Sequence, residues 1–245
     1  MDKLLSPLVA AGLALSAGSA PAAAPPDPVV AIVRVAKPWY APRALVASRM
    51  RDTVDQYAQL PGLMFKAYSF EQASGDFGGV YSWRDRAAAQ AWFNTTWFER
   101  IRRERGVQAQ VRLFDAPVSL DNTSGGTPAD NGSPAVATLV EIPIPAGLPR
   151  ARLEAEFAGA VPVYRKVPGL LRKHFIVSDA GTFGGVYLWA DEASAKTWFN
   201  AAWHQRVSQT YGQEARIEWF DTPILLPTRL PSNQAVAGTL GAATP

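Results

Sequence analysis

The chain has 245 residues, of which 48% are hydrophobic and 18% charged, so it can bury one large core or two small ones. Its 24 basic and 21 acidic residues are scattered along the sequence, without the basic face that a phosphate backbone requires, and we expect no nucleic acid partner. The chain has no cysteine, which excludes disulfides, iron–sulfur clusters, thiol nucleophiles and cysteine-ligated zinc.

The first residues are typical of a secretory signal. Lys3 precedes an apolar run at residues 4–17 and a stretch of small residues that ends at Ala24. A run of about 14 residues is too short to cross a bilayer comfortably. We therefore predict a signal peptide over residues 1–24 and a periplasmic or secreted protein with no stable membrane span after cleavage. An uncleaved anchor and a disordered tail are the alternatives.

A strand, a helix and a hairpin are predicted next. The β-branched run at residues 29–35 predicts a strand. Apolar residues then recur at steps of four, four and three from Val46 to Tyr57, which predicts an amphipathic helix. Strands at residues 63–70 and 77–83 follow, separated by a short turn, and form a hairpin.

A second helix and a fourth strand complete this unit. Asp85 is placed to accept an otherwise unpaired backbone N–H as the N-cap of a helix that runs past Trp97. Residues 109–113 alternate apolar and polar side chains, as a half-buried strand does. The order strand, helix, strand, strand, helix, strand is that of a ferredoxin-like α+β module with both helices on one face of the sheet. We assign this module to residues 28–120.

The same pattern occurs a second time in the chain. Pro-Gly-Leu at residues 61–63 recurs at 168–170, and Phe-Gly-Gly-Val-Tyr-x-Trp at residues 77–83 recurs at 183–189. Further residues repeat in the same order, namely Lys66 as Lys173, Asp85 as Asp191, Asn94 as Asn200, Trp97 as Trp203, and Phe114-Asp115-x-Pro117 as Phe220-Asp221-x-Pro223. We therefore predict a second module of the same fold at residues 135–227.

The composition of the remaining segments indicates how the modules are joined. Residues 121–134 are rich in Gly, Ser, Asn and Thr and form a predicted linker, and residues 228–245 form a predicted disordered tail. An exposed apolar sheet face is costly, so we expect the two sheets to face each other as a pseudo-dimer within one chain, a dimeric α+β barrel. Pro162 lies inside the second copy of the first helix and is expected to kink it.

Candidate catalytic residues are two repeated lysines and one histidine. A lysine such as Lys66 or Lys173 in a partly apolar pocket has a lowered pKa and can stabilise an anion, although a solvated lysine with a buried stem fits the pattern too. His174, beside Lys173, is a candidate base in the second module alone or an incidental histidine. The first module has Ala67 at that position, which argues against a duplicated metal site.

Aromatic and amide side chains near these lysines are candidate substrate-binding residues. Core packing explains the aromatic ones equally well, and an exposed helix position explains the amides. The candidates are Tyr81, Trp83, Asn94 and Trp97 with their counterparts Tyr187, Trp189, Asn200 and Trp203. If one pocket alone functions, we favour the second, because His174 and Trp219 distinguish it from the first. The paired glycines inside the third strand of each module indicate a bulge or a close backbone approach.

These repeated motifs resemble a known family. Pro-Gly-Leu-Leu-x-Lys at residues 168–173, Gly-Gly-Val-Tyr-Leu-Trp at 184–189, an Asp-initiated Ala-rich helix and the closing Phe-Asp-x-Pro resemble the YdhR-like mono-oxygenases. That family belongs to the dimeric α+β barrel superfamily, which includes the antibiotic-biosynthesis monooxygenases. The resemblance covers nearly all of both modules.

The resemblance implies an oxidoreductase of the monooxygenase type. Better-understood relatives oxidise phenols to quinones without a cofactor and carry an Asn on the third strand and a Tyr in the following helix. Here Gly79 and Ala89 stand at those places in the first module, although Trp83 is kept. We predict a protein that acts on a small aromatic or polycyclic molecule with molecular oxygen, without metal or cofactor. The alternative is a noncatalytic small-ligand-binding or structural barrel of the cell envelope.

Overall fold

The computed structural model describes residues 27–123 and 136–226. The predicted signal peptide, residues 124–134 of the predicted linker and the predicted tail lie outside these ranges. The elements of the first module are β1 (Val29–Val35), α1 (Arg43–Arg51), α2 (Val54–Ala58), β2 (Leu63–Glu71), β3 (Phe77–Trp83), α3 (Arg86–Trp92), α4 (Thr95–Arg105) and β4 (Ala109–Asp121). Those of the second are β5 (Val136–Pro143), α5 (Arg150–Tyr164), β6 (Leu170–Ser178), β7 (Thr182–Trp189), α6 (Glu192–Trp198), α7 (Ala201–Tyr211) and β8 (Arg216–Leu226).

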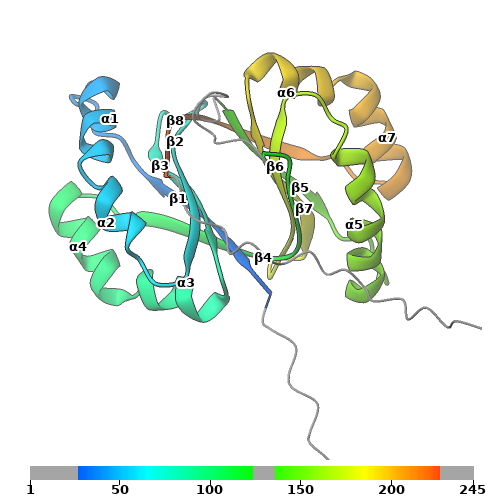
Figure 1. Ribbon diagram of the computed structural model, residues 1–245, viewed down its shortest axis with the longest axis horizontal. Coiled ribbons are helices and arrows are strands. Elements are labelled where there is room, and N and C mark those ends of the chain that lie inside the picture. The colour runs from blue at the N-terminus through cyan, green and yellow to red at the C-terminus, as the bar shows by residue number, and fades with distance from the viewer. Residues whose placement is uncertain (1–26, 124–135, 227–245) are drawn as a thin grey trace, which may run out of the picture.

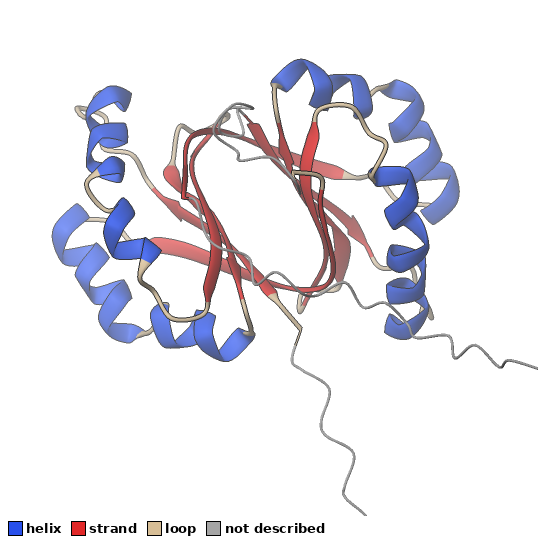
Figure 2. Ribbon diagram, in the orientation of Figure 1, coloured by secondary structure: helices blue, strands red, loops and turns tan. Residues whose placement is uncertain are grey.

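The strands of the described ranges form one closed antiparallel barrel, and the helices lie outside it (Figure 1, Figure 2). Around the barrel the order is β1, β3, β2, β8, β5, β7, β6, β4, so each module contributes one contiguous block of strands. The helices of each module cover the outer face of that module's own strands (Figure 1). This arrangement confirms the predicted fold class of two tandem ferredoxin-like modules that form a dimeric α+β barrel within one chain.

The barrel closes because the fourth strand of each module pairs with both modules. β4 pairs with β1 through residues 109–115 and with β6 through residues 114–121, with a register shift between Asp115 and Val118. The Phe-Asp-x-Pro motif lies at this irregularity, where a proline without an N–H is tolerated. β8 likewise pairs with both β5 and β2. The fourth strand is therefore longer than predicted, and Asp121 belongs to it rather than to the linker.

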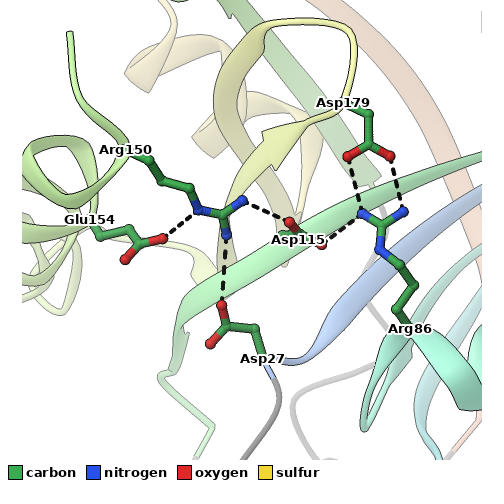
Figure 3. A network of polar contacts seen from close by, with 6 residues as sticks. All are labelled: Asp27, Arg86, Asp115, Arg150, Glu154 and Asp179. Carbon is green, nitrogen blue, oxygen red and sulfur yellow. Dashed lines mark hydrogen bonds and ion pairs between the residues drawn. The ribbon is translucent and has the colours of Figure 1, made fainter.

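The aspartate of this motif joins the two modules (Figure 3). Asp115 accepts hydrogen bonds of 2.7 Å from Arg86 of its own module and 2.7 Å from Arg150, the first residue of α5. Burial alone would raise the pKa of Asp115, but these two arginines hold it below its usual value. Its counterpart Asp221 accepts a hydrogen bond of 2.6 Å from Arg43, the first residue of α1. In both modules the aspartate of this motif therefore binds the first residue of the first helix of the other module.

The observed helices are shorter than the predicted ones where local polar groups end them. The first predicted helix is divided into α1 and α2, and Thr53 between them donates its hydroxyl to the carbonyl of Met50 at 2.8 Å. The equivalent α5 continues to Tyr164 through Pro162, so the helix that is divided is the one without the proline. The second predicted helix is divided in both modules. Asp85 caps α3 as predicted, since its side chain accepts from the backbone N–H of Ala88.

The interior of the barrel is packed with apolar side chains from all eight strands. This cluster consists of Val30, Ile32, Phe65, Ala67, Val80, Phe114, Ala116, Ala137, Leu139, Ile176, Val186, Leu188 and Phe220. Separate clusters fill the space between each half of the barrel and its helices. Because both faces of the strands are covered, the strands carry buried side chains on both sides.

Next to this apolar cluster the strands also direct charged side chains into the barrel, and the sign of their charge differs between the modules. The first module contributes Arg34 and Arg112, whereas the second contributes Glu141 and Glu218 at the equivalent positions. Arg34 pairs with Glu218, and Arg112 pairs with Glu141 at 2.5 Å and with Glu218 at 3.4 Å. Both carboxylates are buried. The inner surface of the first module is therefore complementary in charge to that of the second.

Candidate functional site

Each module has a cavity at the same place of the repeat, between the outer face of its strands and its helices. The cavity of the first module has a volume of about 290 Å³ and that of the second about 270 Å³. Both are lined by equivalent residues of the repeat. These are Tyr57, Lys66, Tyr68, Phe77, Tyr81 and Trp97 in the first module and Tyr164, Lys173, Phe175, Phe183, Tyr187 and Trp203 in the second.

The repeated lysine of each module lies among aromatic rings. Lys66 is only 1% exposed, and its Nζ lies 2.9 Å from the ring centroid of Tyr57 and 3.7 Å from that of Tyr68. Lys173 is 2% exposed, and its Nζ lies 3.1 Å from the ring centroid of Tyr164. These lysines are therefore buried cavity residues, and the alternative of a solvated strand lysine is wrong.

Neither lysine has an acidic partner among the residues that the structure describes. Burial lowers the pKa of Lys66 and of Lys173 well below the usual value. Cation–π contacts with three rings around each lysine oppose this by about 0.5–2 kcal/mol each, and an ammonium removed from water without a counter-ion loses several kcal/mol. Burial is the cause of the lowered pKa. The arrangement favours a neutral amine, which can accept a proton.

The paired glycines provide the space that this packing requires. A Cβ atom on Gly79 would lie 2.9 Å from the carbonyl oxygen of Ala67 and 3.4 Å from Cε of Lys66. On the neighbouring Gly78 it would lie 1.9 Å from the carbonyl oxygen of Val33. The predicted close backbone approach is confirmed, and Gly79 in addition leaves room for the lysine side chain.

The two cavities differ in polar groups that face them. In the first, the hydroxyls of Thr53 and Tyr68 are 2.8 Å apart, and burial raises the pKa of Tyr68 to about 12. In the second, Ala160 and Phe175 occupy these positions, so the hydroxyl pair is absent. The first cavity therefore has more polar groups that can orient a ligand.

The rims of the cavities also differ. Arg49, Glu104 and Arg105 line the first cavity, whereas Glu156 and Tyr211 stand at the positions of Arg49 and Arg105 in the second, which is also lined by Arg206. The charged lining of the first cavity therefore has one more basic than acidic side chain, and that of the second has one of each.

Some of the predicted binding residues line the cavities and others support them. Tyr81 and Trp97 line the first cavity, as Tyr187 and Trp203 line the second. Trp83 and Trp189 do not line these cavities; each lies parallel to the neighbouring tyrosine ring, with an interplanar angle of 10°. The indole N–H of Trp189 donates to the hydroxyl of Thr138 at 3.1 Å. These two tryptophans pack against the tyrosine rings and restrict their orientation.

Asn94 and Asn200 lie outside both cavities. Asn94 is the N-cap of α4: its side-chain oxygen accepts from the backbone N–H of Trp97 at 3.0 Å, and its amide nitrogen donates to the carbonyl of Ala91 at 2.8 Å. Asn200 makes the same pair of bonds at the start of α7. Since both polar atoms of each amide are used locally, the structure assigns these residues a structural role rather than the predicted contact with a ligand.

His174 lies on the barrel side of β6, whereas Lys173 faces the helices. The Nδ1 of His174 is 2.8 Å from the hydroxyl of Ser119, and its Nε2 is buried without a hydrogen-bond partner among the described residues. Burial, aided by Arg172, lowers the pKa of His174 to about 4. Adjacent residues of a strand point to opposite faces, so the structure does not bring His174 to the lysine cavity. Trp219 does not line that cavity either, which removes the reason for favouring the second module.

Tyr57 and Tyr164 are site residues that the sequence did not single out. Both belong to the apolar stripe of the first helix, which predicts core packing, yet their rings lie closer to the lysine nitrogen than any other ring does. A tyrosine occurs at the same position of this stripe in both modules, and this recurrence is the sequence signal that could have identified the two residues. Burial raises the pKa of both hydroxyls, which therefore stay protonated as hydrogen-bond donors.

Within residues 27–123 and 136–226, no three His, Cys, Asp or Glu side chains are grouped so that they could hold a metal ion. In the same ranges no helix is long and apolar enough to cross a membrane.

Comparisons with known proteins agree with the fold. Residues 33–126 match the family model described as "Putative mono-oxygenase ydhR", which confirms the resemblance to that family. No curated protein matches the chain. Among solved structures, a "putative monooxygenase" from Fusobacterium nucleatum subsp. nucleatum ATCC 25586 is similar with a TM-score of 0.58 and 9% identity, covering 82% of this chain and 94% of that chain.

Two other solved structures are similar to the same extent. A "putative monooxygenase" from Lactobacillus acidophilus NCFM has a TM-score of 0.52 at 10% identity, covering 81% of this chain and 95% of that one. An "anthrone oxidase-like protein" has a TM-score of 0.53 at 10% identity, covering 81% and 92%. At such low identity these structures show the shared fold. The family match covers residues 33–126, and the shared fold extends over both modules.

Proposed function

Since its first module matches the YdhR-like mono-oxygenase family, we propose that the chain oxidises a small aromatic molecule with molecular oxygen and without a cofactor. The observation that carries this proposal is the buried lysine without an acidic partner in an aromatic cavity, present in both modules. A convergent polar group in an apolar cavity is the feature that favours an enzyme over a packing module. The tryptophans Trp97 and Trp203 line the cavities without filling them.

The size of the cavities restricts the substrate. Ligand pockets usually measure about 300–1,000 Å³, and volumes of about 290 and 270 Å³ lie at the lower end of that range. The tyrosine and tryptophan rings offer faces and edges on which an aromatic ring packs. A hydroquinone or an anthrone-like compound therefore fits the proposal better than an extended polycyclic molecule.

The chemistry begins with proton transfer to the lysine. The neutral amine of Lys66 accepts the proton of an acidic C–H or O–H group on the substrate, and the resulting ammonium lies beside the anion that forms. The anion transfers electrons to oxygen, and a C–O bond forms. For an anthrone, the lysine then protonates the distal oxygen, the second C–H proton is lost, and the O–O bond breaks. One oxygen atom remains as the new ketone, and the other leaves as water.

The first cavity is the better candidate for this reaction. The hydroxyl pair of Thr53 and Tyr68 and the hydroxyls of Tyr57 and Tyr81 surround Lys66, whereas the second cavity has Phe175 in place of Tyr68. Protonated hydroxyls donate hydrogen bonds to a developing oxyanion. We therefore assign the main activity to the first module.

The test is oxygen consumption by purified protein against a panel of hydroquinones and anthrones. Lys66→Met keeps the length and apolar character of the side chain but removes the base, and it should reduce turnover by about 10²–10⁴-fold. Lys173→Met should have a smaller effect, and Lys196→Met, which changes an exposed lysine, none. Turnover unaffected by both cavity substitutions would remove lysine from the mechanism. Ligand binding without turnover of any compound would favour a noncatalytic binding protein.

A further inference from the structure

Lysine is rare in this chain, and two lysines have been kept in unusual surroundings. The sequence contains 6 lysines and 18 arginines. Among the lysines in the described ranges, Lys66 and Lys173 are the two that are buried, and they occupy equivalent places in the two cavities. An arginine stays protonated in any protein environment, whereas a lysine can become a neutral amine on burial. The structure thus retains lysine where a nucleophilic nitrogen can exist.

We propose that both cavities capture small aromatic aldehydes covalently, as imines on Nζ of Lys66 and of Lys173. This reaction uses the amine as a nucleophile rather than as a base, and it requires no oxygen. The proposal is thus independent of the oxygenation reaction, although it concerns the same cavities.

Three features of the cavities suit them for this reaction. The amine has no acidic partner in the described part of the chain, so no carboxylate there stabilises it as an ammonium ion. The rings around it, Tyr57, Tyr68 and Tyr81 in the first module, present an apolar surface to an aromatic aldehyde. Burial also raises the pKa of Tyr81 well above its usual value, so its hydroxyl remains a proton donor for the departing oxygen.

The covalent step is balanced within the cavity. The lone pair of Nζ attacks the carbonyl carbon and forms a C–N bond, and the carbonyl oxygen takes up a proton to give a carbinolamine. The nitrogen then loses its remaining transferable proton, the C–O bond breaks, and one water molecule leaves. An aldehyde and an amine thus give an imine and water, without any oxidant or reductant.

The test is reductive trapping on the full-length protein. Benzaldehyde is added at pH 7, borohydride reduces any imine to a stable secondary amine, and peptide mapping by mass spectrometry locates the adducts. Each unit by which the pKa is lowered raises the neutral fraction of an amine tenfold at this pH. We therefore expect labelling of Lys66 and Lys173 to be at least tenfold faster than that of the exposed Lys166 and Lys196.

Two controls separate the cavity from general amine reactivity. Phenol, which has the same ring but no aldehyde, should slow labelling of the cavity lysines and leave Lys196 unchanged. Lys66→Met should abolish one adduct and preserve that on Lys173, which also reports that the variant is folded. Equal or slower labelling of the cavity lysines relative to Lys166 and Lys196 would overturn the proposal. If the untreated protein takes up no oxygen with the hydroquinones and anthrones but forms these adducts with benzaldehyde, that result counts against the oxygenase function alone.

Discussion

The aromatic rings around Lys66 and around Lys173 surround an ionisable nitrogen in a buried place where a charge is costly. Because burial lowers the pKa of both lysines, the unfolded chain binds more protons than the folded protein between these lowered values and the usual value of about 10.5. Stability should therefore rise with pH through that window. The arrangement costs stability near neutral pH, as residues kept for chemistry often do.

We predict that the variant Lys66→Met is more stable than the wild type at pH 7, by about 1–3 kcal/mol. The methionine fills the same space without a charge to desolvate. The advantage should shrink as the pH rises toward the usual pKa of about 10.5, because an increasing fraction of the amine in the unfolded chain is then neutral as well. Denaturant unfolding at pH 7 and pH 10 measures this, and a Lys66→Met protein less stable than wild type at pH 7 would mean that the ammonium is well satisfied among the aromatic rings around it.

The hydroxyl of Tyr68 is the residue-level difference between the cavities. The substitution Tyr68→Phe gives the first cavity the residue that the second one has, and the loss of one hydrogen bond should lower kcat/KM about 5- to 10-fold. The double substitution Ala160→Thr and Phe175→Tyr installs the pair in the second cavity and should raise its share of the turnover in a Lys66→Met background. An unchanged kcat/KM in Tyr68→Phe would show that the two cavities are equivalent.

At the scale of elements, the agreement between sequence and structure depends on how local the cause is. Strands β1 and β3 begin and end at the predicted residues, because β-branched runs and flanking turns are local signals. The extension of β4 to Asp121 depends on pairing with β6 of the other module, which no local pattern encodes. The division between α3 and α4 was missed because Phe93 and Asn94 fit within an otherwise helical apolar pattern.

Prediction of the candidate site from the sequence was limited in the same way. The repeat identified Lys66, Tyr81 and Trp97 as site residues, but the sequence did not show that the lysine is buried. Residues 65–70 of β2 are all buried, because the barrel interior covers one face and the helices cover the other. On such a strand the alternation of polar and apolar residues that separates a solvated face from a core face is absent.

The cap residue Asn94 offers a test at this scale. We predict that Asn94→Ala lowers the free energy of unfolding by about 1 kcal/mol and leaves substrate KM unchanged, because the side chain caps α4 and does not line the cavity. Asn94→Ser, which retains a capping oxygen, should recover most of the loss in thermal or denaturant unfolding. A raised KM in the fully folded Asn94→Ala protein would instead support a direct contact with the ligand.

For the whole molecule, the charges inside the barrel determine which module pairs with which. Two copies of the first module would bring Arg34 and Arg112 together with their own duplicates, and two copies of the second would do the same with Glu141 and Glu218. Only the pairing of one module with the other places opposite charges together. The contacts of Asp115 with Arg150 and of Asp221 with Arg43 also join the modules, but they are equivalent in the repeat and therefore stabilise the interface without selecting the partner.

We predict that Glu141→Arg in the full chain destabilises the fold by about 3–5 kcal/mol, because it leaves Arg112 beside a like charge in a largely buried site. Adding Arg112→Glu reverses the pair and should restore part of the loss. The matched change Glu99→Arg on the exposed surface of α4 should remain within about 0.5 kcal/mol of wild type. Equal stability of Glu141→Arg and Glu99→Arg in denaturant unfolding would contradict a pairing role for these charges.

The central claim is that the cavities transfer an oxygen atom from O₂ to a bound aromatic molecule with lysine as the base. The most direct measurement is turnover of an anthrone under ¹⁸O₂ by protein that has been treated with a metal chelator, followed by mass spectrometry of the product. We predict one ¹⁸O atom in the product ketone of the wild type and a rate no higher than the protein-free background for the double variant Lys66→Met and Lys173→Met. Product oxygen that comes from water, or equal labelling at equal rate by that double variant, would contradict the claim.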